Sequence, residues 1–205
     1  FRAGGEQYAE ENESYGLATL QRAHVTVRDR SVAFDYPAKS GVRRELEIED
    51  AEVCRAVRAL LRADQPGDRL LVCRNDTGWT EIRAGDVNTR FKELVGDEYS
   101  IKDLRTWHGT VLAATAFAAA KPPTSKTAIK RETSAVMKEV SGELGNTPAV
   151  ARASYVDPRV VTGYENGLTI ASATKRAETM RDLDKAQELM EKATRQLIRR
   201  VAKRK

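Results

Sequence analysis

The stretch that decides the fold class is His24–Arg62, HVTVRDRSVAFDYPAKSGVRRELEIEDAEVCRAVRALLR. Its first part contains three short runs that alternate or carry β-branched residues, as strands do: His24–Val27, Ser31–Tyr36 and Val42–Ile48. From Asp50, which is available as a helix cap, the apolar residues recur at helical spacing. The sequence therefore predicts an α+β fold, with a small three-stranded antiparallel meander near the N-terminus and a predominantly helical body after it.

Helical periodicity continues through most of the chain. The pattern predicts one short strand at Leu70–Cys73 and helices over Asp50–Arg62, Gly85–Val95, Ile101–Ala120 and Ser125–Leu144. Gly145 is placed to end a helix, and residues 146–148 open the next one, which carries Tyr155. A short helix is also expected within Glu10–Leu20, where carboxylates precede an apolar stretch.

The C-terminal segment has its own pattern. Semi-apolar positions recur at spacings of three and four from Met180 to Val201, which predicts a helix that docks on the body, with a coiled coil as the alternative. Thr194–Lys205 contains Arg and Lys but no acid, so it either tracks phosphates or keeps a terminus soluble. We expect a catalytic domain at 1–172, made of the β-meander at 1–48 and a helical body at 49–172, followed by a basic helix at 173–205 that docks on it.

The composition of the chain limits the classes of protein to which it can belong. The 205 residues suffice for one full domain, and 35 Lys and Arg against 30 Asp and Glu give a net charge of +5, the sign expected for a nucleic-acid partner. Cys54 and Cys73 sit among apolar residues as small buried side chains would, which indicates a reducing cytoplasm. No stretch is long and apolar enough for a membrane span or a signal peptide. Because the chain has no initiator Met and begins abruptly, we expect a fragment of a longer protein.

Several kinds of chemistry have no support in the sequence. There is no zinc-type Cys/His cluster, no acidic magnesium constellation and no glycine-rich phosphate loop. Cleaving a phosphodiester without a metal requires a nucleophile, cations around the non-bridging oxygens and a proton source for the leaving oxygen. The chain offers candidates for each of these roles.

Two stretches carry a specific resemblance. KDLRTWH at Lys102–His108 and GNTPAVARASYVDPR at Gly145–Arg159 closely resemble segments of bacterial and poxvirus-type type IB DNA topoisomerases. The first residues, FRAGGEQYAEENESYGLATLQRAHV, resemble the start of that family's catalytic domain, and FDYPAKSG at Phe34–Gly41 resembles its lysine-bearing hairpin. The resemblance covers roughly residues 1–160. It implies the tyrosine recombinase/topoisomerase IB-like fold and relaxation of supercoiled DNA, without ATP or metal, through a covalent 3′-phosphotyrosyl intermediate.

The resemblance also assigns five site residues. Tyr155 is the nucleophile, Arg2 and Arg105 bind the phosphate, and Lys39 is the general acid for the leaving 5′ oxygen. Asn146, nine residues before Tyr155, stands where the poxvirus-type enzymes have histidine. An amide donates a hydrogen bond but carries neither proton nor charge, so we expect Asn146 to stabilise the transition state and to do no acid–base work.

The expected partner is double-stranded DNA, bound by a monomer that requires no cofactor, metal or nucleotide, in the cytoplasm near the nucleoid. Lys102 shares the helical face of Arg105 and is either a further phosphate contact or a solvated lysine. His108 is assigned a structural role. The resemblance suggests DNA contacts at Tyr8, Asn12 and Ser14, and it implies that the family's N-terminal DNA-clamp domain is absent from this chain.

Two alternatives remain at this point. A tyrosine recombinase or integrase uses the same nucleophile and arginine pair, but it typically has histidine where this chain has Lys102. A non-catalytic DNA-binding module is suggested by the basic C-terminal stretch, and the retention of the matching active-site residues argues against it.

Overall fold

The computed structural model describes residues 1–204 and every side chain within them except that of Ser40. Its contacts divide the chain into two compact units, Phe1–Ile101 and Lys102–Lys205, each with its own apolar core. The sequence assigned residues 49–101 to the helical body, whereas in the structure Cys54, Val57 and Leu70 belong to the core under the sheet.

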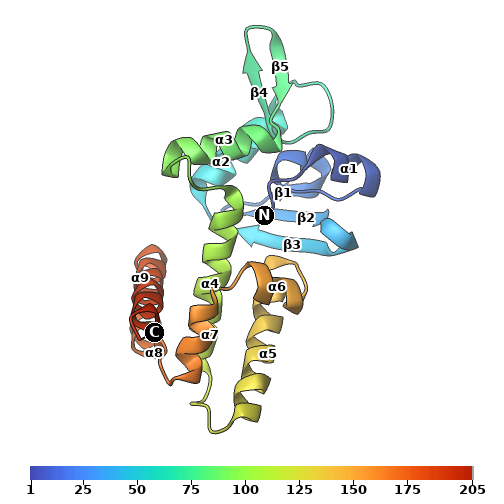
Figure 1. Ribbon diagram of the computed structural model, residues 1–205. Coiled ribbons are helices and arrows are strands. Elements are labelled where there is room, and N and C mark those ends of the chain that lie inside the picture. The colour runs from blue at the N-terminus through green and yellow to red at the C-terminus, as the bar shows by residue number, and fades with distance from the viewer. Residues whose placement is uncertain (205) are drawn as a thin grey trace. The chain divides into compact units, whose positions relative to one another are not determined.

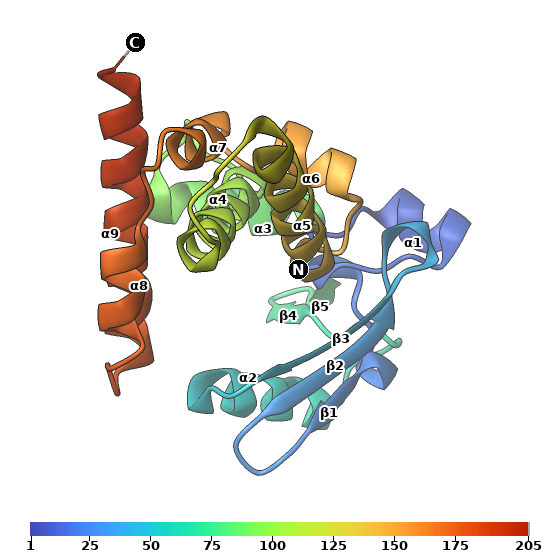
Figure 2. The same ribbon diagram turned by 90° about the horizontal axis from the view of Figure 1, so that it is seen from below.

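The first unit is built on the predicted meander (Figure 1). Strands β1 (Val25–Val27), β2 (Val32–Pro37) and β3 (Arg43–Ile48) pair antiparallel in the order β1-β2-β3. Helix α2 (Ala51–Arg62) packs against β1 and β2 (Figure 2). Val32, Phe34 and Tyr36 of β2 are buried in one core with Cys54 and Val57 of α2. The Asp50 carboxylate caps α2 by accepting from the backbone N–H groups of Glu52 and Val53 at 2.8 and 2.9 Å. The expected meander followed by helices is confirmed.

Three local expectations in this unit are wrong. The helix expected within Glu10–Leu20 is α1 at Glu6–Asn12, because Glu13 adopts a left-handed conformation (φ 46°) that ends it; 3₁₀ turns follow at Leu17–Thr19 and Arg22–His24. The strand expected at Leu70–Cys73 is β4 (Val72–Asn75), which pairs with an unpredicted strand β5 (Gly78–Glu81). Cys73 is exposed on this hairpin rather than buried. Helix α3 (Ala84–Val95) follows.

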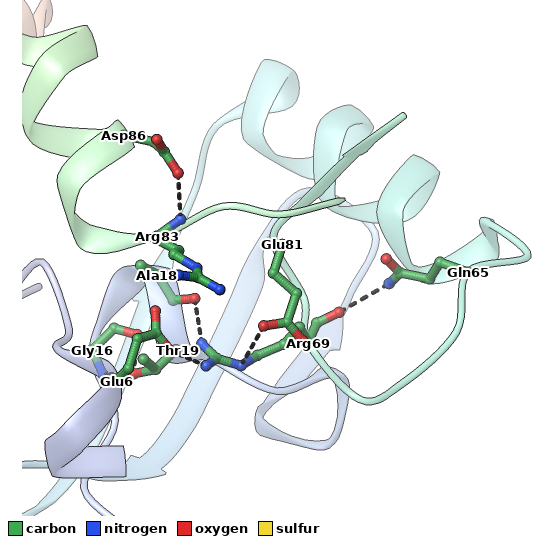
Figure 3. A network of polar contacts seen from close by, with 9 residues as sticks. All are labelled: Glu6, Gly16, Ala18, Thr19, Gln65, Arg69, Glu81, Arg83 and Asp86. Carbon is green, nitrogen blue, oxygen red and sulfur yellow. Dashed lines mark hydrogen bonds and ion pairs between the residues drawn. The ribbon is translucent and has the colours of Figure 1, made fainter. Parts of the chain in front are cut away.

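Arg69 ties the first residues of the chain to this unit, as Figure 3 shows. Its side chain is 17 % exposed, forms an ion pair with Glu6 of α1, donates to the Ala18 carbonyl at 2.8 Å and lies 3.8 Å from the Glu81 carboxylate of β5. A guanidinium with several donors can satisfy all three groups at once. The segment that carries Arg2 is thereby anchored at its far end.

The second unit is entirely helical in its described residues. It comprises α4 (Ile101–Ala119), which begins at the unit boundary, and then α5 (Lys126–Leu144), α6 (Pro148–Ser154), α7 (Pro158–Glu165), α8 (Ala171–Ala177) and α9 (Leu183–Ala202). Ala113 and Ala114 are almost completely buried on α4, where small side chains let neighbouring helices approach closely. Phe117 of α4 stacks on Tyr164 of α7 with ring centres 4.7 Å apart.

The C-terminal segment forms α8 and α9, and α9 packs against both α7 and α8. Its buried face consists of Ala186, Thr194, Leu197 and Val201. The predicted stripe starts too early, because Met180 precedes the helix and Leu183 is 81 % exposed. No helix among residues 1–204 is long and apolar enough to cross a membrane.

Candidate active site

One face of α4 carries the residues around which the site of the second unit is built. Arg105, Thr106, Gly109 and Thr110 recur at helical spacing and therefore share a face. That face contacts the segment from the end of α5 to the start of α7, which contains Asn146 and Tyr155. The KDLRTWH and GNTPAVARASYVDPR stretches, which 36 residues separate in the sequence, thus meet in space.

Arg105 joins the two stretches directly. Its Nη2 donates to the Leu144 carbonyl at 2.9 Å, and its Cζ lies 5.2 Å from the centre of the Tyr155 ring. Leu144 is the last residue of α5, where helix carbonyls lack partners of their own and favour a cation. The guanidinium is therefore held at the phenol ring by an anchor on a neighbouring helix.

Asn146 is placed by backbone geometry. Gly145 ends α5 with a left-handed φ of 63°, and the N–H groups of Gly145 and Asn146 donate to the carbonyls of Gly142 and Ser141 at 3.2 and 2.9 Å. This is a Schellman motif, and Thr147 then caps α6 by accepting from the Val150 N–H at 3.3 Å. Asn146 stands between two fixed helix ends.

The side chain of Asn146 is the unusual feature of this loop. Both its Nδ2 and its Oδ1 are buried, and neither has a hydrogen-bond partner among the described residues. A buried amide without a partner costs about 1–3 kcal/mol, so this amide is available to pair with a ligand or with water. The amide nitrogen is a donor of the kind that binds a non-bridging phosphate oxygen.

Tyr155 lies one residue beyond the end of α6, as its C-cap, rather than inside the helix as expected. Its N–H donates to the Ala151 carbonyl at 3.0 Å. On the other side, the Thr110 hydroxyl accepts from the Asp157 N–H at 3.1 Å and lies 3.4 Å from the Tyr155 carbonyl oxygen. Thr110 is 2 % exposed, so this backbone contact is sealed from water.

Gly109 allows that contact. A Cβ at position 109 would lie 2.7 Å from the Tyr155 carbonyl oxygen and 3.0 Å from Leu144 Cδ1, both closer than ordinary contact. Only glycine lets the backbone of α4 approach the backbone of Tyr155 this closely. Gly109 therefore sets the position of Tyr155 along α4.

Asp157 begins α7 two residues after Tyr155. It caps the helix by accepting from the Arg159 N–H at 2.9 Å, and it pairs with the Arg159 side chain. Burial raises the pKa of Asp157, but the hydrogen bonds and charge of Arg159 outweigh it and leave the pKa lowered. The carboxylate therefore stays ionised and fixes the chain on the C-terminal side of Tyr155.

Lys39 and Arg2 belong to the first unit. Lys39 is exposed in the short turn between β2 and β3, as predicted, and its Nζ lies 4.7 Å from the centre of the Tyr8 ring. The turn is tied to the preceding segment because the Ser14 hydroxyl donates to the Ala38 carbonyl at 3.2 Å. Ser14 is itself buried, whereas Tyr8 and Asn12 of α1 are exposed.

Arg2 is positioned by two glycines that touch. Its carbonyl accepts from the Leu17 N–H at 2.8 Å. Gly4 has a φ of 87°, and a Cβ on Gly16 would lie 2.6 Å from the Gly4 Cα and 2.9 Å from the Arg2 carbonyl oxygen. No larger residue fits at either position.

The sequence is similar to known topoisomerases over most of its length. A family model described as the catalytic core of eukaryotic DNA topoisomerase I matches residues 1–196. The chain belongs to this family. A relative from Acanthamoeba polyphaga mimivirus, DNA topoisomerase 1B, is 28 % identical over 173 residues, which cover 80 % of this chain and 51 % of the relative. The chain thus spans about half the length of this curated relative.

This topoisomerase I membership confirms the type IB topoisomerase catalytic domain that the sequence predicted. The matches are of eukaryotic and viral type, so the bacterial affinity stays a prediction. Among residues 1–204, no group of three His, Cys, Asp or Glu side chains is placed to hold a metal ion.

Of the remaining residues singled out in this topoisomerase core, Lys102 is exposed at the start of α4. His108 is exposed too, and partial desolvation lowers its pKa against the opposing effect of the Glu143 carboxylate. Sequence reasoning missed Gly109 and Thr110, whose contacts are with Leu144, Tyr155 and Asp157, 35 or more positions away. The one signal for them was a glycine directly after KDLRTWH, within a helix otherwise rich in alanine.

Proposed function

We propose that this chain cuts and reseals one strand of double-stranded DNA and thereby relaxes supercoils, as a monomer and without ATP, metal or other cofactor. The observation that carries the proposal is the Arg105 guanidinium 5.2 Å from the Tyr155 ring, beside a loop whose buried Asn146 amide has no partner among the described residues. A tyrosine, a fixed cation and an unused amide donor are what a phosphoryl-transfer site needs.

The roles follow from the chemistry of each group. The Tyr155 oxygen attacks a backbone phosphorus and loses its proton to solvent, while the bond to the 5′ oxygen breaks and that oxygen takes a proton from Lys39. Arg2 and Arg105 bind the non-bridging oxygens as planar forks, and Asn146 donates one neutral hydrogen bond to them. The product is a 3′-phosphotyrosyl link and a free 5′-hydroxyl.

The reaction needs no external energy. One phosphodiester is exchanged for another of similar energy, so the 5′-hydroxyl can attack the phosphotyrosyl link and reseal the strand. While the link exists, the free end rotates and the torsion stored in the DNA is released. Contacts to the backbone hold the duplex without regard to sequence, and we include Lys102, Tyr8 and Asn12 among them. Because Ser14 is buried and donates to the hairpin, its contribution is to orient the turn that bears Lys39.

The test uses negatively supercoiled plasmid in EDTA without ATP, with the parent chain and Tyr155→Phe side by side. We expect relaxation and a covalent protein–DNA adduct with the parent alone. A short duplex with a break just beyond the cut site, which traps the adduct, gives a second readout that needs no supercoiling. If the parent yields neither relaxed plasmid nor trapped adduct, the proposal is wrong.

A further inference from the structure

The outer face of α9 carries a row of cations that the proposed reaction does not use. Lys192, Arg195, Arg199 and Lys203 are all exposed, and their spacing of three, four and four residues places them on one helical face. Leu197 and Val201 lie on the opposite face and are buried in the core of the second unit. Figure 2 shows α9 beside α8. We call these four residues the α9 stripe.

The α9 stripe is not neutralised within the part of the chain that the structure describes. None of its four side chains takes part in an ion pair among residues 1–204, whereas Lys185 at the start of the helix pairs with Asp182 at 2.9 Å. The sequence from 192 to 204 holds six basic residues and no acid. Like charges at this spacing destabilise a helix by about 0.2–0.5 kcal/mol per pair, so the α9 stripe lowers the stability of α9.

The helix dipole does not explain the row. Cations near a helix C-terminus are favoured, but the effect falls off within the last turn. That accounts for Arg199, while Lys192 and Arg195 lie well before the end of the helix at Ala202. Solubility alone also leaves unexplained why acids are excluded from this half of α9, since Asp184, Glu188 and Glu191 occur in the other half.

The length of the α9 stripe and the spacing of its cations suit binding to a DNA duplex. From Lys192 to Lys203 the helix rises about 16 Å, with a cation every 5 Å or so. B-DNA presents one phosphate charge per roughly 1.7 Å of its axis, so each stripe residue has phosphates within reach of its long side chain. Lys and Arg contacts to phosphate are independent of sequence, as a relaxing enzyme requires.

We propose that the α9 stripe is a second DNA-binding surface, which holds the duplex backbone outside the cleavage site. The proposal takes its ligand, DNA, from the proposed function but does not depend on cleavage. Its effect is on binding and on the salt dependence of binding, not on the rate at which bound DNA is cut.

The experiment measures duplex affinity between 50 and 300 mM salt in a Tyr155→Phe background, which keeps the DNA uncut. The stripe variant is Lys192→Gln/Arg195→Gln/Arg199→Gln/Lys203→Gln, because glutamine is a good helix former that removes only the charge. Each lost phosphate contact lowers the slope of log affinity against log salt by about 0.9, so we expect a slope smaller by roughly 3–4.

The matched control removes four exposed cations from the first unit, in Arg30→Gln/Arg55→Gln/Arg62→Gln/Arg90→Gln. It changes the net charge by the same amount, and we expect its slope to change by less than 1. Arg195→Lys/Arg199→Lys keeps the charge and should keep the parent slope. With Tyr155 restored and DNA saturating, the single-turnover cleavage rate of the stripe variant should equal that of the parent.

Three results overturn the proposal: an unchanged slope in the stripe variant, an equal change in the control, or displacement of duplex by polyglutamate at equal charge concentration. The last would make the stripe a general polyanion surface. Failure of the proposed function gives a different result. If the protein binds DNA with a salt dependence that the stripe variant changes, but forms no covalent adduct, then the proposed cleavage is wrong and the proposed DNA-binding role of the α9 stripe is still supported.

Discussion

Replacing Gly109 with alanine tests whether α4 positions Tyr155, the proposed nucleophile. The new Cβ would lie 2.7 Å from the Tyr155 carbonyl oxygen, whereas ordinary contact begins near 3.4 Å, so the backbone of Tyr155 must shift by about 0.7 Å. A misplacement of 1 Å can cost 10²-fold in rate. We therefore expect cleavage to slow by roughly 10- to 100-fold, or about 1.4–2.7 kcal/mol in the barrier.

Stability should change far less than activity. Alanine gains about 1 kcal/mol over glycine inside a helix, and overpacking costs about 1–3 kcal/mol, so the net loss is between zero and about 2 kcal/mol. For a chain of this size the melting temperature should fall by at most about 8 °C. Gly109→Ala therefore stays folded at the assay temperature.

The assay is single-turnover formation of the covalent adduct on a suicide duplex, with saturating protein and a parallel thermal melt. Gly142→Ala on α5 is the control, because a Cβ at this position would have no neighbouring atom within 4 Å. This variant should cleave at the parent rate. Thr110→Val, which removes the acceptor for the Asp157 N–H, should also slow cleavage, and Thr110→Ser should restore it. A folded Gly109→Ala variant that cuts at the parent rate would refute the positioning argument.

Three further outcomes follow from the geometry. Asn146→Ala should slow adduct formation on the order of 100-fold, because it removes a donor to the phosphate. The melting temperature should stay the same or rise, because the replaced amide is buried and has no described partner. An unchanged rate of adduct formation would contradict the proposed role of Asn146. Asp157→Asn keeps a capping residue but loses the ion pair to Arg159, so it should lower stability by about 0.5–1 kcal/mol at neutral pH. The folded pKa of Asp157 is lowered, so its contribution exists above the unfolded value and disappears as pH falls below about 4, where denaturant melts of variant and parent should converge. Tyr164→Phe removes a 2.8 Å hydrogen bond to the Lys121 carbonyl and should lower stability by about 1 kcal/mol with no change in cleavage, as paired melts and adduct assays will show.

Local signals explain what the sequence predicted well. Asp50 and Ser125 begin helices through side-chain caps, and Gly145 ends one in a left-handed conformation, so neighbouring residues alone fix these boundaries. Strand β5 was missed because Gly-Trp-Thr-Glu does not alternate, and it exists through pairing with β4. The buried position predicted for Cys73 failed for the same reason, since the β4–β5 hairpin leaves it exposed.

The same distinction between local signals and long-range contacts applies to the residues of the site. Residues with distinctive chemistry, such as Arg105 and Tyr155, could be proposed from their motifs, and the structure brings these two side chains together. Gly109 and Thr110 could not be proposed in this way, because a glycine's value depends on a backbone 46 residues later, and no local pattern encodes that distance. Contacts of high sequence separation decide how closely the reactive groups are held, and they appear only once the helices pack.

The Schellman turn at Gly145 has a consequence for position 146. Its hydrogen bonds use the main chain of residues 141–146, and Thr147 secures the other side, so nothing in the loop's shape depends on the side chain at position 146. The backbone of the loop therefore does not restrict the side chain at position 146, and it would accept the asparagine found here or the histidine that the resemblance to poxvirus-type enzymes leads us to expect. Under the proposed function, an exchange of the side chain at position 146 would change how the phosphate is bound without altering the backbone around Tyr155.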